Sequence, residues 1–260
     1  MQDCWARTIG IVGLGSFGRF LVRHLGARFD VQVWDRRELS AEAAALGASW
    51  TDLEGCAGCD IVIPAVPVQD LDGLIADLAP RLAPGALVVD VASVKVKPLR
   101  ILEQRLPRQV QFIGTHPMFG PQSGRDGIRG LKVVLCLPER PVDSERVEAV
   151  RAFLESDLEL QVLEMSAEEH DSEMAYIQGL THWMAKALRE IHVPNPALGT
   201  VAYRHMMKIE ENLRDDSDDL FLTIARENPF AAEARRELRE RLREIEEAIE
   251  QEATANGPDR

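Results

Sequence analysis

Short apolar runs recur through the first half of the chain, separated by segments with helical spacing. The runs are rich in valine and isoleucine, as is typical of strands buried on both faces. Between them, residues 17–28 and 70–82 place apolar side chains at the spacing of amphipathic helices. This alternation predicts a mainly parallel sheet covered by helices. The predicted strands are residues 9–13, 31–35, 60–64, 86–90, 111–114 and 132–136.

The pattern changes after one further predicted strand, at residues 158–163. Ser-Ala-Glu-Glu at residues 166–169 has the form of a capping box and predicts the start of a long helix. Asn228-Pro229 predicts a cap followed by proline at the first position of the last helix. We therefore predict two domains: an α/β domain over residues 1–165 and an all-α domain over residues 166–260.

The last predicted helix carries a narrow apolar seam on an otherwise charged surface. Leu238, Leu242, Ile245 and Ile249 follow one another at spacings of four, three and four residues. One alternative is that this helix lies on its own domain. A narrow stripe is better suited to helix–helix pairing, which predicts a homodimer through the C-terminal helices.

A glycine-rich turn connects the first predicted strand to the helix after it. In Gly-Leu-Gly-Ser-Phe-Gly, Gly13 makes the tight turn, Gly15 admits a pyrophosphate, and Gly18 lets helix and strand pack closely. The helix N-terminus offers free N–H groups to phosphates. Asp35 ends the second strand, where a carboxylate accepts hydrogen bonds from ribose hydroxyls. The N-terminal domain is therefore predicted to be a dinucleotide-binding Rossmann domain.

Asp35 also bears on the choice between NAD and NADP. Its carboxylate would repel a 2′-phosphate, which favours NAD. Arg36 and Arg37 follow directly and could instead hold that phosphate, so NADP stays open as the less favoured cofactor. The alternative to both is that the glycines merely shape a turn. The candidate cofactor-binding residues are Gly13, Gly15, Ser16, Phe17, Gly18, Asp35, Arg36, Val66 and Pro67.

A histidine stands beyond the end of a predicted strand, where open parallel sheets bind their ligands. His116 belongs to Gly-Thr-His-Pro-Met-Phe-Gly-Pro at residues 114–121, a segment stiffened by proline and glycine. A neutral imidazole is suited to accept a proton at physiological pH. Ser93, at the neighbouring strand end, is predicted to hydrogen-bond this imidazole and fix its tautomer. Lys95 either steers a carboxylate or is a solvated residue at a helix start.

Charge and composition exclude several classes of partner. The chain has 260 residues, a formal net charge of −13 and a pI near 5.0, so it repels nucleic acid and anionic membrane surfaces. A small anionic substrate would need a local cluster of Lys or Arg. The sequence has neither an N-terminal signal pattern nor a run of about 18 apolar residues. We therefore expect a cytoplasmic protein with no membrane partner.

Two cysteines have the spacing of a redox or zinc motif. Cys56-Ala-Gly-Cys59 has no second ligand pair at a suitable spacing, and it precedes a predicted strand instead of opening a helix after one. We expect ordinary reduced thiols and no bound metal.

Taken together, these motifs resemble the prephenate and arogenate dehydrogenases of tyrosine biosynthesis. The resemblance runs from the glycine-rich turn through residues 114–121 to Glu-His-Asp-Ser-Glu-Met-Ala-Tyr-Ile-Gln-Gly-Leu-Thr-His at residues 169–182. It implies an NAD-dependent oxidative decarboxylation of prephenate to 4-hydroxyphenylpyruvate. His116 would take the proton of the ring hydroxyl while hydride passes to nicotinamide, and Ser93 would orient both His116 and the hydroxyl.

The resemblance also implies where substrate binds. His182 matches the family's second histidine, and Gln178 lies one helical turn before it. Asn212 stands where the family usually has an arginine that grips a substrate carboxylate, and this loss should weaken prephenate binding. Arg204 matches an arginine of some relatives, whereas Arg214 lies two residues past the gap. His170-Asp171 belongs to the family signature, and packing or capping is favoured for His170 over a functional role.

The Asn212 departure leaves alternatives to prephenate open. One is 4-amino-4-deoxyprephenate, which would be converted to 4-aminophenylpyruvate. Another is arogenate, whose extra ammonium group needs an acid nearby; residues 174–182 contain none, which favours a keto-acid side chain. The alternative from another class is a catalytically silent dinucleotide-binding protein that reports redox state.

Overall fold

The computed structural model describes residues 6–191, 197 and 199–255. Within them, eight strands form one sheet in the order β3-β2-β1-β4-β5-β6-β7-β8. All neighbouring strands are parallel except β6 and β7. The predicted fold, a mainly parallel Rossmann-like sheet followed by helices, is confirmed. The strands are β1 (Thr8–Val12), β2 (Asp30–Trp34), β3 (Ser49–Trp50), β4 (Ile61–Pro64), β5 (Leu87–Asp90), β6 (Gln111–Pro117), β7 (Lys132–Cys136) and β8 (Gln161–Glu164).

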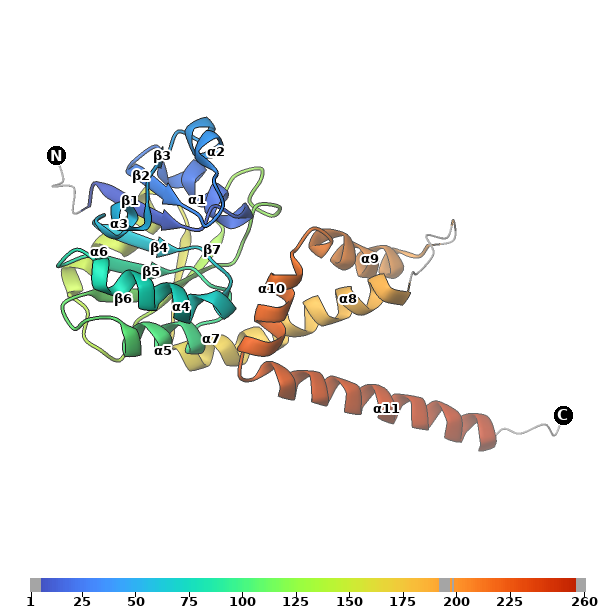
Figure 1. Ribbon diagram of the computed structural model, residues 1–260. Coiled ribbons are helices and arrows are strands. Elements are labelled where there is room, and N and C mark those ends of the chain that lie inside the picture. Colours follow the sequence, from blue (N-terminus) through green and yellow to red (C-terminus); the bar gives the residue numbers. More distant parts are fainter. Residues whose placement is uncertain (1–5, 192–196, 198, 256–260) are drawn as a thin grey trace.

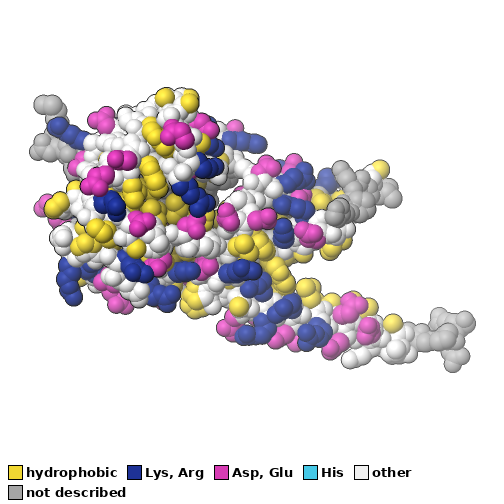
Figure 2. Space-filling model, in the orientation of Figure 1, with side chains coloured by type: hydrophobic (Ala, Val, Ile, Leu, Met, Phe, Trp, Pro, Cys, Tyr) yellow, Lys and Arg dark blue, Asp and Glu magenta, His cyan; other side chains and the backbone are white. Residues whose placement is uncertain are grey.

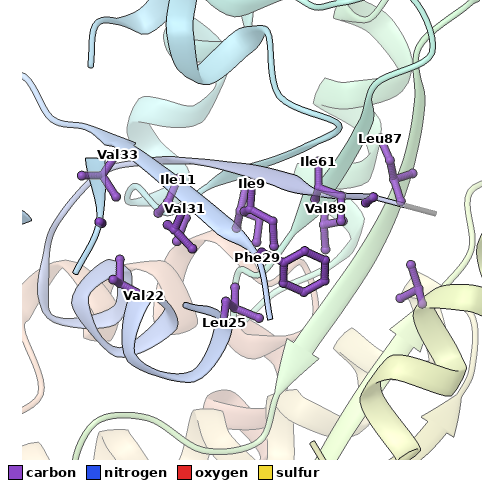
Figure 3. Close-up of a cluster of buried hydrophobic side chains, with 14 of the residues drawn as sticks. Ile9, Ile11, Val22, Leu25, Phe29, Val31, Val33, Ile61, Leu87 and Val89 are labelled. Atoms are coloured by element: carbon purple, nitrogen blue, oxygen red, sulfur yellow. The ribbon is translucent and has the colours of Figure 1, made fainter. Parts of the chain in front are cut away.

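Helices cover both faces of this sheet (Figure 1). Side chains of α1, α2 and α6 join the hydrophobic cluster on one face, whereas those of α3, α4 and α5 join the cluster on the other. Figure 3 shows Val22 and Leu25 of α1 facing Ile9, Ile11 and Val31 of the sheet. These helices are α1 (Ser16–Leu25), α2 (Ser40–Ala45), α3 (Leu53–Ala57), α4 (Val68–Leu78), α5 (Val96–Arg105) and α6 (Ser144–Ala152).

The alternation along β1 shows why these strands contain so few polar residues. Ile9 and Ile11 point to one apolar cluster, whereas Val12 belongs to the other. Gly10 faces α3 so closely that a Cβ there would lie 2.2 Å from the carbonyl oxygen of Cys56. Both faces of the strand are therefore packed against helices, as its unbroken apolar run predicts.

Two predicted strands have a boundary that differs by more than one residue, and the short β3 was not predicted. β6 continues to Pro117, so His116 lies inside the strand and pairs with Val134 of the antiparallel β7. The extension depends on a partner strand that returns after residues 118–131. The strand predicted at residues 158–163 begins later, as β8 at Gln161, because Glu159 adopts a left-handed conformation, with φ of 53°, just before it.

After β8 the described chain is helical. α7 (Ala167–Met174), a π-helical segment (Ala175–Leu180) and α8 (Thr181–Ile191) run on without a break. The predicted capping box is present, since the Ser166 hydroxyl accepts from Glu169 N and the Glu169 carboxylate accepts from Ser166 N. Figure 1 shows α11 diverging from the arm formed by α8 and α9. The remaining helices are α9 (Val201–Leu213), α10 (Asp218–Leu222) and α11 (Ala231–Ala255).

Asn228 connects the start of α11 to α7. Its Nδ2 donates to the carbonyl oxygen of Asp171 at 2.7 Å, and its Oδ1 accepts from Phe230 N at 2.9 Å. The predicted cap is therefore present, but the helix begins at Ala231, two residues after Pro229. None of the helices in the described part of the chain is both long enough and apolar enough to cross a membrane.

Replacing Asn228 with alanine should destabilise the protein by about 1–3 kcal/mol, because a buried carbonyl and a backbone N–H lose their partner. Urea unfolding measures this change. Asn212, which is exposed on α9, is the matched control, and Asn212→Ala should change the unfolding free energy by less than about 0.5 kcal/mol. Equal losses in the two variants would contradict this role for Asn228.

Candidate active site

The turn between β1 and α1 forms an open cradle. Gly13 has a φ of +107°, and a Cβ on it would lie 2.5 Å from the carbonyl oxygen of Ala65. A Cβ at Gly15 would meet nothing within 4 Å, so the space above the helix N-terminus is open. Gly15 is the N-cap residue of α1 and has no side chain that could occupy the free N–H groups. The first turn of the helix also contains no acid. The N–H groups of the first turn, which includes Ser16 and Phe17, therefore suit the phosphates of a dinucleotide.

Gly18 and Val66 shape the same turn. A Cβ at Gly18 would lie 2.0 Å from the carbonyl oxygen of Gly13, so only glycine allows this approach of helix to strand. Val66 lies against Gly13 from the end of β4, and Pro67 is the residue before α4. The carboxyl ends of β1 and β4 thus meet at the cradle.

Asp35 supports the cradle from the end of β2. Its carboxylate accepts from Leu14 N at 2.8 Å and from Arg37 N and Nε at 2.9 and 3.0 Å. Burial opposes ionisation, but the hydrogen bonds from Arg37 and Leu14 outweigh it and lower the pKa of Asp35 to about 2. The Arg36 side chain points away from Asp35. It is 81% exposed, and its Nη1 lies 3.9 Å from Oδ2 of Asp70. Arg37 is therefore the arginine nearer to a ribose at Asp35.

His116 lies near the carboxyl end of β6, on the same edge of the sheet. It is only 4% exposed, and its Nδ1 lies 2.8 Å from Nε2 of His170. In the described part of the chain, Nε2 of His116 has no hydrogen-bond partner. Among the described residues, Gln111 Oε1 is the only fully buried side-chain nitrogen or oxygen without a partner. The unpartnered Nε2 of His116 is therefore not fully buried and is accessible from the site. This nitrogen is the atom that can meet a ligand.

Burial keeps this imidazole neutral. The pKa of His116 lies well below its usual range because of desolvation first, and then because of His170 and Lys95. Lys95 is not solvated as one prediction had it: it is 0% exposed, and its ammonium contacts the Asp90 carboxylate and the Thr115 carbonyl oxygen. A neutral imidazole is the form that accepts a proton.

The predicted contact from Ser93 to this imidazole is not found. Ser93 is partly buried in the loop between β5 and α5, and no hydrogen bond joins it to His116 among the described residues. His170, which was expected to serve packing or capping, contacts Nδ1 instead. His170 Nδ1 in turn lies 2.8 Å from Asp171 Oδ1. The sequence signal for this arrangement was the adjacent His-Asp pair near a helix start.

His182 has an acidic neighbour that the local sequence does not reveal. Its Nδ1 lies 2.9 Å from the carbonyl oxygen of Gln178, and its Nε2 lies 3.2 Å from Oδ2 of Asp216. Asp216 comes from the turn between α9 and α10, 34 residues further along the chain. Residues 174–182 contain no acid, but the folded protein brings one to His182.

The predicted cationic residues are engaged elsewhere. Arg204 donates to the carbonyl oxygen of Gly199 near the start of α9. It lies about 15 Å along the helix axis from Arg214 at the other end of α9, the end next to Asp216 and His182. Arg214 pairs with the buried Glu210 at 2.6 Å. Asn212 is exposed on the same helix. The structure therefore does not bring Arg204 and His182 together within one chain.

The π-helical segment aligns His170 with His182. These residues are twelve apart, about 18 Å along the axis. Residues four apart drift around an α-helix because a turn takes 3.6 residues. In the π-helical turn each hydrogen bond reaches i+5, so four residues fall short of a full turn and offset the drift. Met174 and Gln178 lie between the two histidines at the same four-residue spacing.

Cys56 and Cys59 are buried next to the sheet. Burial raises the pKa of the Cys56 thiol to about 12, so it is not a reactive thiolate. Across the described residues, no group of three or more His, Cys, Asp or Glu side chains is placed to hold a metal ion.

Residues 17–158, over half of the chain, match the model of the prephenate dehydrogenase nucleotide-binding domain. The chain belongs to the prephenate dehydrogenase family. Residues 187–258 match a second model, the TYRAAT1-like C-terminal domain. The nucleotide-binding match begins at Phe17, directly after Gly13 and Gly15, and it includes Gly18, Asp35 and His116.

Individual relatives are similar over most of this chain. Arogenate dehydrogenase 1 of Arabidopsis thaliana is 32% identical over 86% of this chain and 36% of its own length. Arogenate dehydrogenase 2 of the same plant is 30% identical over 88% of this chain and 66% of its own. The chain thus spans between about a third and two thirds of these relatives. Prephenate dehydrogenase from Aquifex aeolicus, solved with hydroxyphenyl propionate and NAD+, superposes with a TM-score of 0.77 at 25% identity, covering 95% of this chain and 92% of that one.

The lowered pKa of His116 predicts an acid-sensitive fold. Below about pH 6.5 the unfolded chain binds a proton at residue 116 that the folded protein excludes, so stability is lost as pH falls. His116→Asn should reduce the slope of unfolding free energy against pH by up to about 1.36 kcal/mol per pH unit. Urea unfolding between about pH 7 and 5.5 measures the slope.

His205, exposed on α9, provides the control, and His205→Asn should leave that slope unchanged. A His116→Asn variant whose slope equals that of the unaltered protein would show that His116 takes up its proton in the folded state.

Proposed function

We propose that the protein is a nicotinamide-dependent dehydrogenase that oxidises a small anionic cyclohexadienyl substrate with loss of its ring carboxylate. The observation that carries this proposal is the buried, neutral His116, whose accessible Nε2 lies on the sheet edge that also holds the dinucleotide cradle. β1 and β6 are three strand spacings apart, about 14 Å. A dinucleotide laid across the edge spans such a distance.

The residues around the cradle fit NAD. Gly13, Gly15 and the first turn of α1 would hold the pyrophosphate, and the Asp35 carboxylate would accept from the ribose. The 2′-phosphate of NADP would meet that carboxylate and also Arg37, so NAD is the first choice and NADP the second. Bound nicotinamide would supply the hydride acceptor.

His116 would act as the base. Its Nε2 would accept the proton of the ring hydroxyl as the ring carbon is oxidised. Loss of carbon dioxide then makes the ring aromatic, so the reaction does not reverse. Ser93 remains the predicted contact to the hydroxyl, from the neighbouring strand end.

Asp216 favours arogenate over prephenate as substrate. The sequence pointed to a keto-acid side chain because residues 174–182 lack an acid, but Asp216 lies at His182 in the folded protein. A carboxylate there suits the ammonium of arogenate, and the exposed Asn212 offers no guanidinium for prephenate. The two Arabidopsis relatives are named arogenate dehydrogenases, which supports the same choice. Prephenate and 4-amino-4-deoxyprephenate are the second candidates.

Steady-state rates with the three substrates, each with NAD and NADP, test this order. Asp216→Asn should lower kcat/KM for arogenate by about tenfold to a hundredfold, the value of a charge-assisted hydrogen bond, and leave the rate with prephenate unchanged or higher. Asp215→Asn, one residue away and exposed, is the control.

Equal losses with arogenate and prephenate would contradict a role for Asp216 in substrate choice. If His116→Asn changes no rate with any of the three substrates, the silent dinucleotide-binding protein is the better description.

We also propose that α11 pairs with α11 of a second copy. Leu242, Ile245 and Ile249 are 54%, 57% and 58% exposed, while Leu238 is partly buried near the root of the helix. The helix therefore does not lie on its own domain over this stretch. Figure 2 shows charged side chains along the projecting α11 and hydrophobic ones along its edge. A self-complementary stripe on a free helix is suited to pairing with its own copy.

Ile245→Asp should convert the dimer to a monomer, because two carboxylates would be buried in the helix pair. Sedimentation velocity at micromolar protein measures the change. Glu246→Gln, on the charged side of the same helix, should leave the dimer intact. A monomeric unaltered protein, or a dimeric Ile245→Asp variant, would contradict this interface.

A further inference from the structure

A buried row of three side chains leads from the start of α5 to the base. Asp171 Oδ1 lies 2.8 Å from His170 Nδ1, and His170 Nε2 lies 2.8 Å from His116 Nδ1. Asp171 is 0% exposed and His170 is 1% exposed. At these distances each contact needs one N–H donor facing one acceptor, because two donors or two lone pairs would repel each other.

Asp171 sets the direction of the row. Lys95 N donates to its Oδ1 at 2.7 Å, and Val96 N donates to its Oδ2 at 2.9 Å. These donors are backbone N–H groups at the N-terminus of α5, a position that stabilises negative charge. The carboxylate is an acceptor on every side, so His170 must present Nδ1–H to it.

The rest of the row follows from the chemistry of imidazole. A neutral imidazole has one N–H and one bare nitrogen, so a His170 protonated at Nδ1 has a bare Nε2. In this neutral form, Nε2 of His170 accepts from Nδ1–H of His116. Nε2 of His116 is then bare, and it is the atom without a partner among the described residues.

We propose that His170 and Asp171 are positioning residues that hold His116 in the tautomer with Nδ1 protonated and Nε2 free to accept the substrate proton. The inference deepens the proposed function, since it rests on His116 as its base. Neither positioning residue touches the substrate in this arrangement; both act through His116.

The charges around the row suit a base that becomes cationic during the reaction. His116 faces His170 from α7 and Lys95 at the start of α5, and the ammonium of Lys95 is paired with Asp90 at the end of β5. When His116 gains the substrate proton, its Nδ1–H still donates to His170. Asp171 then stabilises the positive charge through His170, and the proton stays on Nε2 of His116.

Two variants of His170 separate positioning from packing. His170→Phe fills the site but has no acceptor for His116. It should lower kcat with arogenate by about a hundredfold, within the usual contribution of a general base, and leave KM nearly unchanged. His170→Gln presents a carbonyl oxygen to His116 and should recover kcat to within about tenfold of the unaltered protein. His205→Phe, on an exposed part of α9, should leave kcat unchanged.

Nitrogen-15 NMR of the histidine rings gives a readout that does not depend on activity. The unaltered protein should show His116 protonated at Nδ1, His170→Phe should show a mixture of both tautomers, and His170→Gln should restore the single form. Protonation of His116 at Nε2 in the unaltered protein, or an unchanged tautomer in His170→Phe, would overturn the inference. A Gln variant no more active than the Phe variant would overturn it too.

The two proposals can fail separately. If the NMR spectra give the expected tautomers but no cyclohexadienyl substrate turns over, the dehydrogenase proposal is wrong and the tautomer assignment stands.

Discussion

The carboxylate of Asp171 holds together parts of the molecule that are far apart in the sequence. Its two oxygens accept the first N–H groups of α5, and one of them also contacts His170. The carbonyl oxygen of the same residue accepts from Asn228, just before α11. A buried carboxylate is costly unless every lone pair is engaged, and here the donors come from both the sheet domain and the helices. The position of His116 therefore depends on correct docking of the helical part.

This dependence explains how a mostly apolar sheet can carry a polar site. The strands supply rigidity, because valine and isoleucine pack on both faces. The polar groups gather where β5 and β6 end and where α7 contacts α5. Lys95 and Asp90 neutralise each other within this layer. His116 can thus be buried without a charge of its own, which is the condition for accepting a proton.

Local patterns in the sequence predicted the elements better than the contacts between them. Valine and isoleucine runs gave six strands, and the glycine turn and the capping box appear where their spacing places them. The extension of β6 depends on pairing with β7, which no local pattern encodes. The contact between His116 and His170 spans 54 residues, and that between His182 and Asp216 spans 34. Periodicity cannot show which distant side chains meet, so the contacts of His170, Lys95 and Asp216 emerged only from the fold.

The π-helical segment between α7 and α8 makes the hydrogen-bond pattern of this rod as important as the identity of its residues. An α-helix turns by about 100° per residue, so twelve α-helical residues would leave His182 about 120° around the axis from His170. The wider π-helical turn takes up about one extra residue and removes most of that angle. Converting residues 175–180 to regular α-helix at unchanged length would therefore turn His182 away from the row that begins at His170, even though every side chain of the site was still present.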